Sequence, residues 1–359
     1  MSLMPLDVVV RADARGGATI TWSWPGDSFQ RSLTVVELTE VMDLARGATE
    51  GRSASRGRRL PIFGERLGQL AVGDANTARL LDSLDRSHER FTLVCIESDL
   101  PWVTALPWEA LVLPGTTVPL LFHRRVYGWF DFARVCPTGE TTAGRRAELK
   151  CLACWSLPVP GDLQVRSEVE ELRDREMRHP RVRFRWVLNP SLQELRTRLG
   201  LECALFLYAG HGRLDGAAYL LELASGPVTV DALFDALVRS RVEVLVFDSC
   251  WSGLAHADAG PPSLLRRLPT ATCLLGMQGR ASDVISRIHM PALVESVLSG
   301  QPIWTVVNLL RMNLYEQGRD DWPLPVIHLK RCYVPFPVAG WRHAYLDALG
   351  KTAPLGREV

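Results

Sequence analysis

Two residues that could carry out nucleophilic catalysis, His211 and Cys250, each follow a short apolar run of the sequence. A thiolate is a strong nucleophile, and an adjacent imidazole can take the thiol proton and later give it to a leaving group. The pair is therefore enough for acyl transfer through a thioester, and so for hydrolysis of an amide bond. Taken alone, each residue has a plainer explanation, because a Cys at a strand end is commonly a core residue and a His between glycines commonly bonds its own turn.

The segments around these residues predict a strand, a crossover helix and a second strand. The apolar runs 205–208 and 242–247 are the predicted strands, and the amphipathic segment 229–239 is the predicted helix. A crossover of this kind makes the strands parallel, and the carboxyl ends of parallel strands share the edge where α/β sheets bind ligands. We therefore expect His211 and Cys250 to meet in one crevice.

The residues around this pair resemble the two catalytic motifs of the caspase-like cysteine peptidases. The similarity is greatest to the CHAT domain, a peptidase family related to caspases and separase. It rests on YAGHG (208–212), DSCWSG (248–253) and three flanking segments: LPWEAL (106–111), GMQ (276–278) with Ser282 and Asp283, and 321–329. It covers about residues 60–335 and implies that His211 is the base and Cys250 the nucleophile. The N–H groups of Gly212 and Cys250 are then the expected oxyanion donors.

Asp248 departs from the common CHAT pattern, in which a small or apolar residue precedes the cysteine by two positions. The sequence DSCWSG is more similar to the metacaspases, where an acid at this place lines the pocket for the residue before the cut. A carboxylate there would pair with a cationic side chain, so we expect cleavage after a basic residue, Arg rather than Lys. Asp283 is a second candidate acid. Alternatively, Asp248 caps the following turn or orients the dyad.

The resemblance implies an α/β fold, a caspase-like sandwich with a mainly parallel sheet flanked by helices. The alternation of strand and helix patterns after residue 149 predicts the same kind of sheet. A stretch rich in Pro, Gly and Thr, 136–148, predicts a linker. We therefore divide the chain into an N-terminal supporting region (1–140), a peptidase domain (146–335) and a C-terminal tail (336–359). By resemblance, the N-terminal region is a degenerate caspase-like half.

Within the N-terminal region the basic stretch 51–59 stands out. It is rich in Gly, Ser and Arg and predicts a mobile surface loop. A nucleic-acid contact or a processing site is the alternative, but no aromatic residues are interleaved with the charges, which favours the plain loop. The neighbouring patterns predict a β-hairpin over 6–24, helices over 33–45 and within 64–86, and strands at 91–96 and 119–126.

Composition excludes several kinds of partner. The net charge of +1 gives no global attraction to nucleic acid, and no apolar run is long enough to cross a bilayer. The N-terminus lacks a signal-peptide pattern, so we expect a cytoplasmic protein. Cys151 and Cys154 have CxxC spacing, but on a strand they would point to opposite faces, so we expect reduced core thiols. The histidines outside the dyad show no metal-ligand spacing, and we expect no metal or cofactor.

The resemblance implies a protein substrate and a separate activating protein. Prokaryotic relatives act in antiviral defence, so we expect a regulated role in defence or cell death, with a pore-forming or regulatory effector as substrate. Two other functions stay open: a catalytically silent interaction module, and a thiol hydrolase of small esters or amides. The presence of both dyad residues argues against the silent module.

Overall fold

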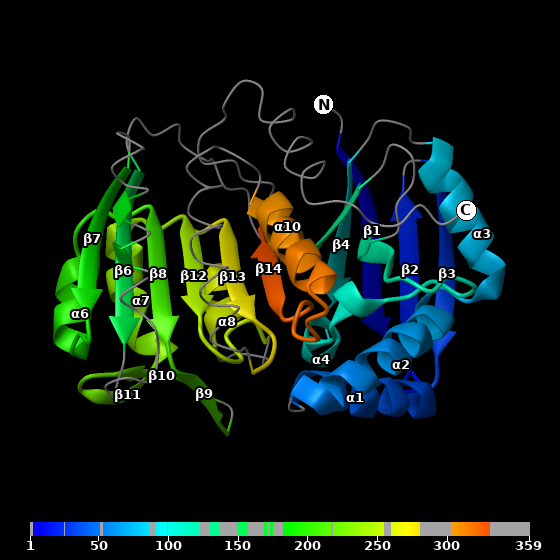
Figure 1. Cartoon of the computed structure of the whole chain (residues 1–359), viewed down its shortest axis with the longest axis horizontal. Helices are drawn as coiled ribbons and strands as arrows, with labels where there is room; N and C mark the ends of the chain where they lie inside the picture. Colours follow the sequence, from blue (N-terminus) through cyan, green and yellow to red (C-terminus); the bar gives the residue numbers. More distant parts are fainter. Residues whose placement is uncertain are drawn as a thin grey trace.

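The computed structural model describes residues 3–24, 26–50, 53–86, 91–98, 100–122, 129–135, 149–156, 169–170, 173–174, 182–216, 218–254, 260–280 and 303–330. In these residues eleven strands form one sheet, in the order β3-β2-β1-β4-β5-β14-β13-β12-β8-β6-β7. The sheet extends across the whole molecule (Figure 1). We call residues up to 135 the N-terminal half and residues from 149 the C-terminal half. A small sheet, β11-β10-β9, lies at one end of the C-terminal half.

The N-terminal half packs helices against one core. Its strands are β1 (Leu3–Ala12), β2 (Ala18–Trp24), β3 (Asp27–Leu33), β4 (Phe91–Ser98) and β5 (Trp129–Val135). Its helices are α1 (Val35–Glu50), α2 (Ser53–Ala71), α3 (Asp74–Arg86) and α4 (Pro101–Thr104), with 3-10 turns at Trp108–Ala110 and Leu120–Phe122. Alternate residues of β1, β2 and β4 are buried in this core, which fits strands with one fully covered face. The Trp22 indole N–H donates to the Ala71 carbonyl oxygen (2.9 Å) and fixes the end of α2 on β2.

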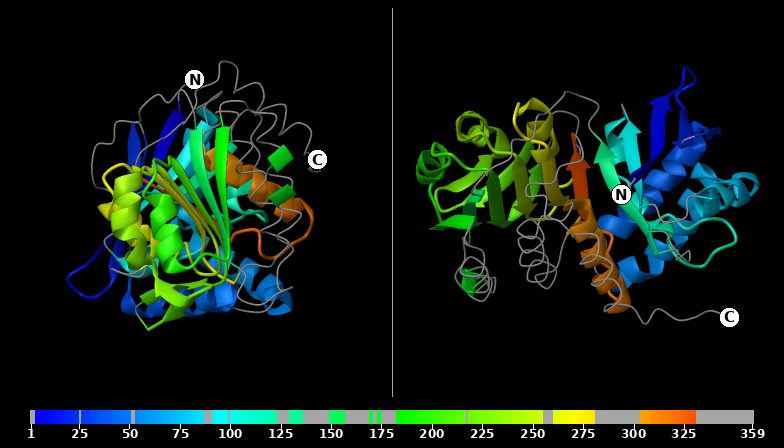
Figure 2. Two further views of the ribbon diagram at one scale, coloured as in Figure 1. Left: turned by 90° about the vertical axis from the view of Figure 1, so that its left-hand side faces the viewer. Right: turned by 90° about the horizontal axis from the view of Figure 1, so that it is seen from above.

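The C-terminal half has a core on each face of the sheet. Its strands are β6 (Leu149–Ser156), β7 (Val182–Leu188), β8 (Leu205–Gly210), β12 (Val244–Asp248), β13 (Cys273–Met277) and β14 (Pro325–Leu329). One face packs against α6 (Leu192–Leu199), α7 (Phe234–Ser240) and α8 (Pro261–Arg267), and α10 (Ile303–Glu316) lies on the other (Figure 2). Every residue of β12, β13 and β14 is buried, because both faces of these strands are covered.

A buried polar network joins the two halves. The Glu109 carboxylate accepts hydrogen bonds from the Arg311 guanidinium (2.8 Å) and the Gln278 amide (3.3 Å), and both charged side chains are 0% exposed. Arg311 also donates to the Pro325 carbonyl oxygen, and Gln278 donates to that of Pro323. The three segments that flank the catalytic motifs in the sequence thus meet at one point. Beside this network β5 and β14 pair in parallel and make the sheet continuous.

One prediction for the N-terminal region was wrong because a helix was mistaken for a loop. Most of the basic stretch 51–59 belongs to α2, which begins at Ser53. Arg56, Leu60 and Phe63 are buried at helical spacing, while Arg58 is exposed. The glycines and serines of this stretch disguised an amphipathic helix, and burial of one face outweighed their weak helix propensity.

The predicted strand at 119–126 was wrong over residues 120–122, which form a 3-10 turn, and its residues 123–126 lie outside the described part of the chain. The sequence patterns missed β3, β5 and the small sheet of β9 (Gly212–Asp215), β10 (Ala218–Leu223) and β11 (Gly226–Thr229). The predicted linker at 136–148 and the tail from 336 lie outside the described residues. None of the helices in the described part of the chain combines the length and the apolar character of a membrane span.

Candidate active site

The strands that precede His211 and Cys250 are neighbours in the sheet. β8 and β12 are parallel, and their last paired residues are Ala209 and Asp248. His211 and Cys250 each lie two residues beyond that pair, so they leave the same edge of the sheet at the same level. Both are partly exposed to solvent. The predicted parallel pairing and the shared edge are confirmed.

Gly212 brings the backbone that follows His211 against the backbone of Cys250. A Cβ atom at Gly212 would lie 3.1 Å from the Cys250 carbonyl oxygen and 1.9 Å from the Tyr219 hydroxyl. A side chain would push these groups apart, so the close approach requires glycine. The two predicted oxyanion donors, Gly212 and Cys250, therefore belong to adjacent backbone segments.

Tyr219 is a residue of this site that the sequence did not reveal. It lies on β10, which pairs with β9 directly after His211. Its buried hydroxyl donates to the Cys250 carbonyl oxygen (2.9 Å) and bonds the Ser249 hydroxyl (2.8 Å). Burial raises the pKa of Tyr219, so the phenol remains a donor. The apolar run 218–221 could have indicated a strand, but no local signal indicates the contact with Cys250.

The turn after Cys250 is fixed by the two residues that close the motif, Ser252 and Gly253. The buried Ser252 hydroxyl donates to the Phe247 carbonyl oxygen (2.7 Å) and accepts from the Met277 N–H (3.0 Å). The Gly253 N–H donates to the Met277 carbonyl oxygen (2.8 Å), and a Cβ there would lie 2.2 Å from a side chain of β14. The serine and the glycine therefore tie the turn to β13 and β14.

Trp251, directly after Cys250, has a left-handed backbone conformation with φ of 66°. This conformation is strained for a residue with a side chain, and it persists where surrounding contacts hold the backbone. Here the Trp251 N–H donates to the Gly279 carbonyl oxygen (3.1 Å). On the other side of the turn, the His328 Nε2 lies 2.8 Å from the Gly253 carbonyl oxygen. Cys250 thus precedes a turn that is held at several points.

Asp248, the predicted acid of the substrate pocket, is the last residue of β12 and is 3% exposed. It follows Val244 and Val246 on the same face of the strand, since side chains alternate along it. Burial is the largest cause of the raised pKa of Tyr219, and the negative charges of Cys250 and then of Asp248 add to it. The second predicted acid, Asp283, lies outside the described residues.

Solved structures that are similar to this chain include three caspase-like cysteine peptidases. Separase from Saccharomyces cerevisiae, in its complex with securin, matches 91% of this chain with a TM-score of 0.56 and 10% identity. The chain spans only 30% of that separase chain. The Arg-specific cysteine proteinase gingipain R matches 72% of this chain and 68% of its own (TM-score 0.44, 10% identity). Caspase-1 from Spodoptera frugiperda matches 56% of this chain and 99% of its own (TM-score 0.35, 12% identity).

No family model matches the sequence, and no curated protein matches it. The likeness to separase extends over nearly the whole chain and includes both halves of the sheet. The fold is caspase-like. The predicted α/β class, with a mainly parallel sheet flanked by helices, is confirmed.

Within this caspase-like fold, the four cysteines of β6, β13 and the approach to β8 are core residues. Cys151 and Cys154 belong to the cores on opposite faces of the sheet, as their spacing predicted. Burial raises the pKa of Cys203 to about 11 and raises that of Cys154 and Cys273 further. These thiols stay protonated at neutral pH and are poor nucleophiles. No group of three His, Cys, Asp or Glu side chains in the described residues is arranged to hold a metal ion.

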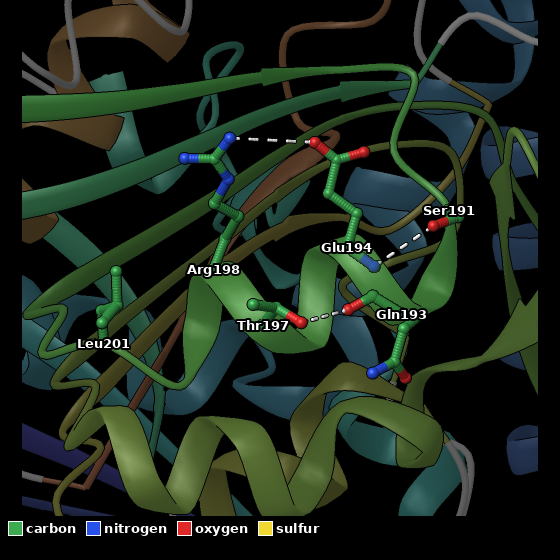
Figure 3. Close-up of a pocket in the computed structure, with 6 residues that line it drawn as sticks. All are labelled: Ser191, Gln193, Glu194, Thr197, Arg198 and Leu201. Atoms are coloured by element: carbon green, nitrogen blue, oxygen red, sulfur yellow. Dashed lines mark hydrogen bonds and ion pairs between the residues drawn. The ribbon is translucent and has the colours of Figure 1, made fainter.

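A hollow of about 550 Å³ lies along α6 (Figure 3), and neither His211 nor Cys250 lines it. Its polar side chains stabilise the helix itself: Ser191 caps it by accepting from the Glu194 N–H (3.2 Å), and Thr197 bonds back to Gln193. Glu194 and Arg198 form an ion pair on the same helix. The hydroxyls of Ser191 and Thr197 are engaged with the helix backbone, and no His or Cys lines the hollow, so the candidate active site stays at the ends of β8 and β12.

Proposed function

We propose that the chain is a cysteine endopeptidase in which His211 is the base and Cys250 the nucleophile. The observation that carries the proposal is the exit of both residues, at the same level, from two adjacent parallel strands. The contact of Gly212 with the Cys250 carbonyl oxygen supports it, because it brings the two motifs together. The likeness to separase supports the fold in which such a site would work.

The proposed reaction passes through a thioester. His211 takes the proton of the Cys250 thiol, and the sulfur attacks the carbonyl carbon of the scissile bond. The N–H groups of Gly212 and Cys250 donate to the oxyanion. The C–N bond breaks as His211 gives its proton to the leaving amine. A water molecule, deprotonated by His211, then hydrolyses the thioester and restores the thiol.

We further propose that Asp248 selects a basic residue before the cut, Arg over Lys. A carboxylate that is nearly excluded from water gains most from pairing with a guanidinium, which can bind it through two hydrogen bonds. Its position in the chain, two residues before the proposed nucleophile, supports a place close to the reacting bond. Asp283 is a second proposed acid of the same pocket.

A panel of fluorogenic peptides with Arg, Lys, Asp or Leu before the cut tests both proposals. We expect cleavage after Arg and, more slowly, Lys, abolished in Cys250→Ala and His211→Ala. In Asp248→Asn we expect the preference for Arg to weaken more than the cleavage of the Leu peptide. Preference for Asp before the cut would contradict the basic pocket. Hydrolysis of small esters without cleavage of any peptide or protein would indicate a small-molecule thiol hydrolase instead.

We propose that the regulator is a separate chain and that the substrate is a protein effector in a cytoplasmic defence or cell-death pathway. The separase structure, a complex with securin, is an example of a caspase-like peptidase that forms a complex with a second component. In this proposal residues 1–140 are a degenerate caspase-like half that supports the peptidase domain, 146–335. Mapping the new N-termini in neighbouring proteins co-expressed with the wild type, and not with Cys250→Ala, tests the assignment. Absence of any cut in proteins encoded beside this chain would contradict it.

A further inference from the structure

Arg56 lies in the first turns of α2, far from the dyad in the sequence, and is only 4% exposed. Its guanidinium donates to the Thr49 carbonyl oxygen at the end of α1 (3.4 Å) and to the Arg280 carbonyl oxygen after β13 (3.1 Å). A buried guanidinium at such a junction must be stabilised by its surroundings, because an isolated buried charge is costly.

The contacts of Arg56 lead directly to the nucleophile. Arg280 follows Gly279, whose carbonyl oxygen accepts from the Trp251 N–H (3.1 Å), and Trp251 follows Cys250. A Cβ at Gly279 would lie 2.8 Å from the Thr49 carbonyl oxygen, so the end of α1 also packs on this segment. The guanidinium is therefore one backbone segment away from the turn that presents the thiol.

The charges around Arg56 come from three elements. Asp320 and Asp321 lie in the segment after α10, and Cys250 follows β12; the negative charge of each opposes the lowering of the Arg56 pKa that burial causes. Gly57 packs beside Asp320, with a Cβ position 3.4 Å from its Oδ2 atom, and Arg319 pairs with Asp321 (2.9 Å). The guanidinium thus interacts electrostatically with two carboxylates and with the thiol.

We propose that Arg56 is a positioning residue of the active site, through which the N-terminal half supplies a positive charge that favours the thiolate of Cys250 and holds the turn behind it. This role of Arg56 rests on the proposed peptidase function, because a more reactive thiol serves catalysis only if Cys250 is the nucleophile. A cation near a thiol stabilises the thiolate, which is the nucleophilic form. Asp320 interacts with the same guanidinium and offsets part of its positive charge, so Arg56 and Asp320 should change the reactivity of Cys250 in opposite directions.

The test is the rate of alkylation of Cys250 by iodoacetamide in the full chain, measured by mass spectrometry from pH 5 to 10. This readout needs no peptide substrate, so it remains informative if the peptidase proposal fails. In Arg56→Gln the loss of positive charge should move the pH profile to higher pH and slow alkylation about three- to tenfold at neutral pH. In Arg56→Lys, which keeps the charge, the profile should stay close to that of the wild type.

Asp320→Asn should shift the pH profile of alkylation in the opposite direction. Because Asp320 is partly exposed, we expect this variant to fold, so it remains informative if Arg56→Gln does not. Removal of its charge should move the profile to lower pH and speed alkylation, which general damage to the site would not do. Arg58→Gln, an exposed arginine on the same helix, is the matched control and should leave the profile unchanged. If Arg56→Gln does not fold, the shift in Asp320→Asn decides the outcome. An Asp320→Asn profile that coincides with that of the wild type would overturn the inference.

Discussion

The two halves of the sheet use their strand ends differently. In the N-terminal half, β4 ends at Ser98, whose hydroxyl donates to the Val10 carbonyl oxygen (2.9 Å) and accepts from the Leu100 N–H (3.0 Å). In the C-terminal half, β8 and β12 end just before His211 and Cys250, which remain partly exposed. The first strand end is closed by its own hydrogen bonds, and the other two present reactive groups to solvent.

The halves also differ in the direction of their strands. β13 and β14 are antiparallel, so β1, β4 and β5, which run parallel to β14, run opposite to β8 and β12. The contacts of the N-terminal half with the site region therefore come from its helices and turns rather than from its strands. Glu109 reaches the junction from a 3-10 turn, and Arg56 reaches it from α2. The N-terminal half thus supplies supporting contacts, and the C-terminal half carries the proposed reacting groups. Substitutions at the junction between the halves can test this difference.

The largest effect is expected at the junction, from Glu109→Ala. The change leaves the Arg311 guanidinium buried without its carboxylate, which should lower the free energy of unfolding by about 3–5 kcal/mol. Chemical denaturation followed by fluorescence measures this loss. Glu65→Ala, an exposed carboxylate on α2, should change the stability by less than about 0.5 kcal/mol. Equal stability of the two variants would show that the network does not join the halves.

A second pair of changes places the same added methyl group in each half. The Cβ of Gly212→Ala would meet the Tyr219 hydroxyl, and that of Gly17→Ala would lie 2.3 Å from the Leu33 carbonyl oxygen. We expect Gly212→Ala to lower kcat/KM about 100-fold, because it separates the two motifs, with a smaller loss of stability. Gly17→Ala should lower the stability by about 1–3 kcal/mol and leave kcat/KM of the folded protein unchanged. Comparable losses of kcat/KM in both variants would remove the distinction between the halves.

The smallest effect is expected from Tyr219→Phe. It removes the donor to the Cys250 carbonyl oxygen and should lower kcat/KM about tenfold and the stability by about 1 kcal/mol. Tyr315→Phe is the control, because its ring packs between Phe122 and Trp322 and stays in place. If both variants keep wild-type kcat/KM, Tyr219 has no part in holding the nucleophile.

Local sequence was sufficient to predict those parts of the structure that depend on a single strand and the residues that end it. The apolar runs before His211 and Cys250 gave both strands, their parallel pairing and their common edge. The opposite faces of Cys151 and Cys154 followed from strand geometry alone. These features follow from the spacing of residues within a single segment of the chain.

Features made by segments far apart in the chain escaped prediction. The contact of Tyr219 with Cys250 depends on a hairpin that folds back onto the strand end. The charge of the buried Arg56 is stabilised by Asp320 and Asp321, more than 250 residues away, so the sequence around it is typical of a polar loop. The flanking segments were noticed by resemblance, but only the structure shows that Glu109, Gln278 and Arg311 share one network.

The central claim is that Cys250 is a nucleophile activated by His211. Labelling by a peptide electrophile with Arg before the reactive group, located by mass spectrometry, tests it most directly. We predict one adduct, on Cys250, absent in Cys250→Ala and formed at least about 100-fold more slowly in His211→Ala. Cys95→Ala, which removes the partly exposed thiol of β4, should label like the wild type. Labelling of Cys95 in place of Cys250, or an unchanged rate in His211→Ala, would contradict the claim.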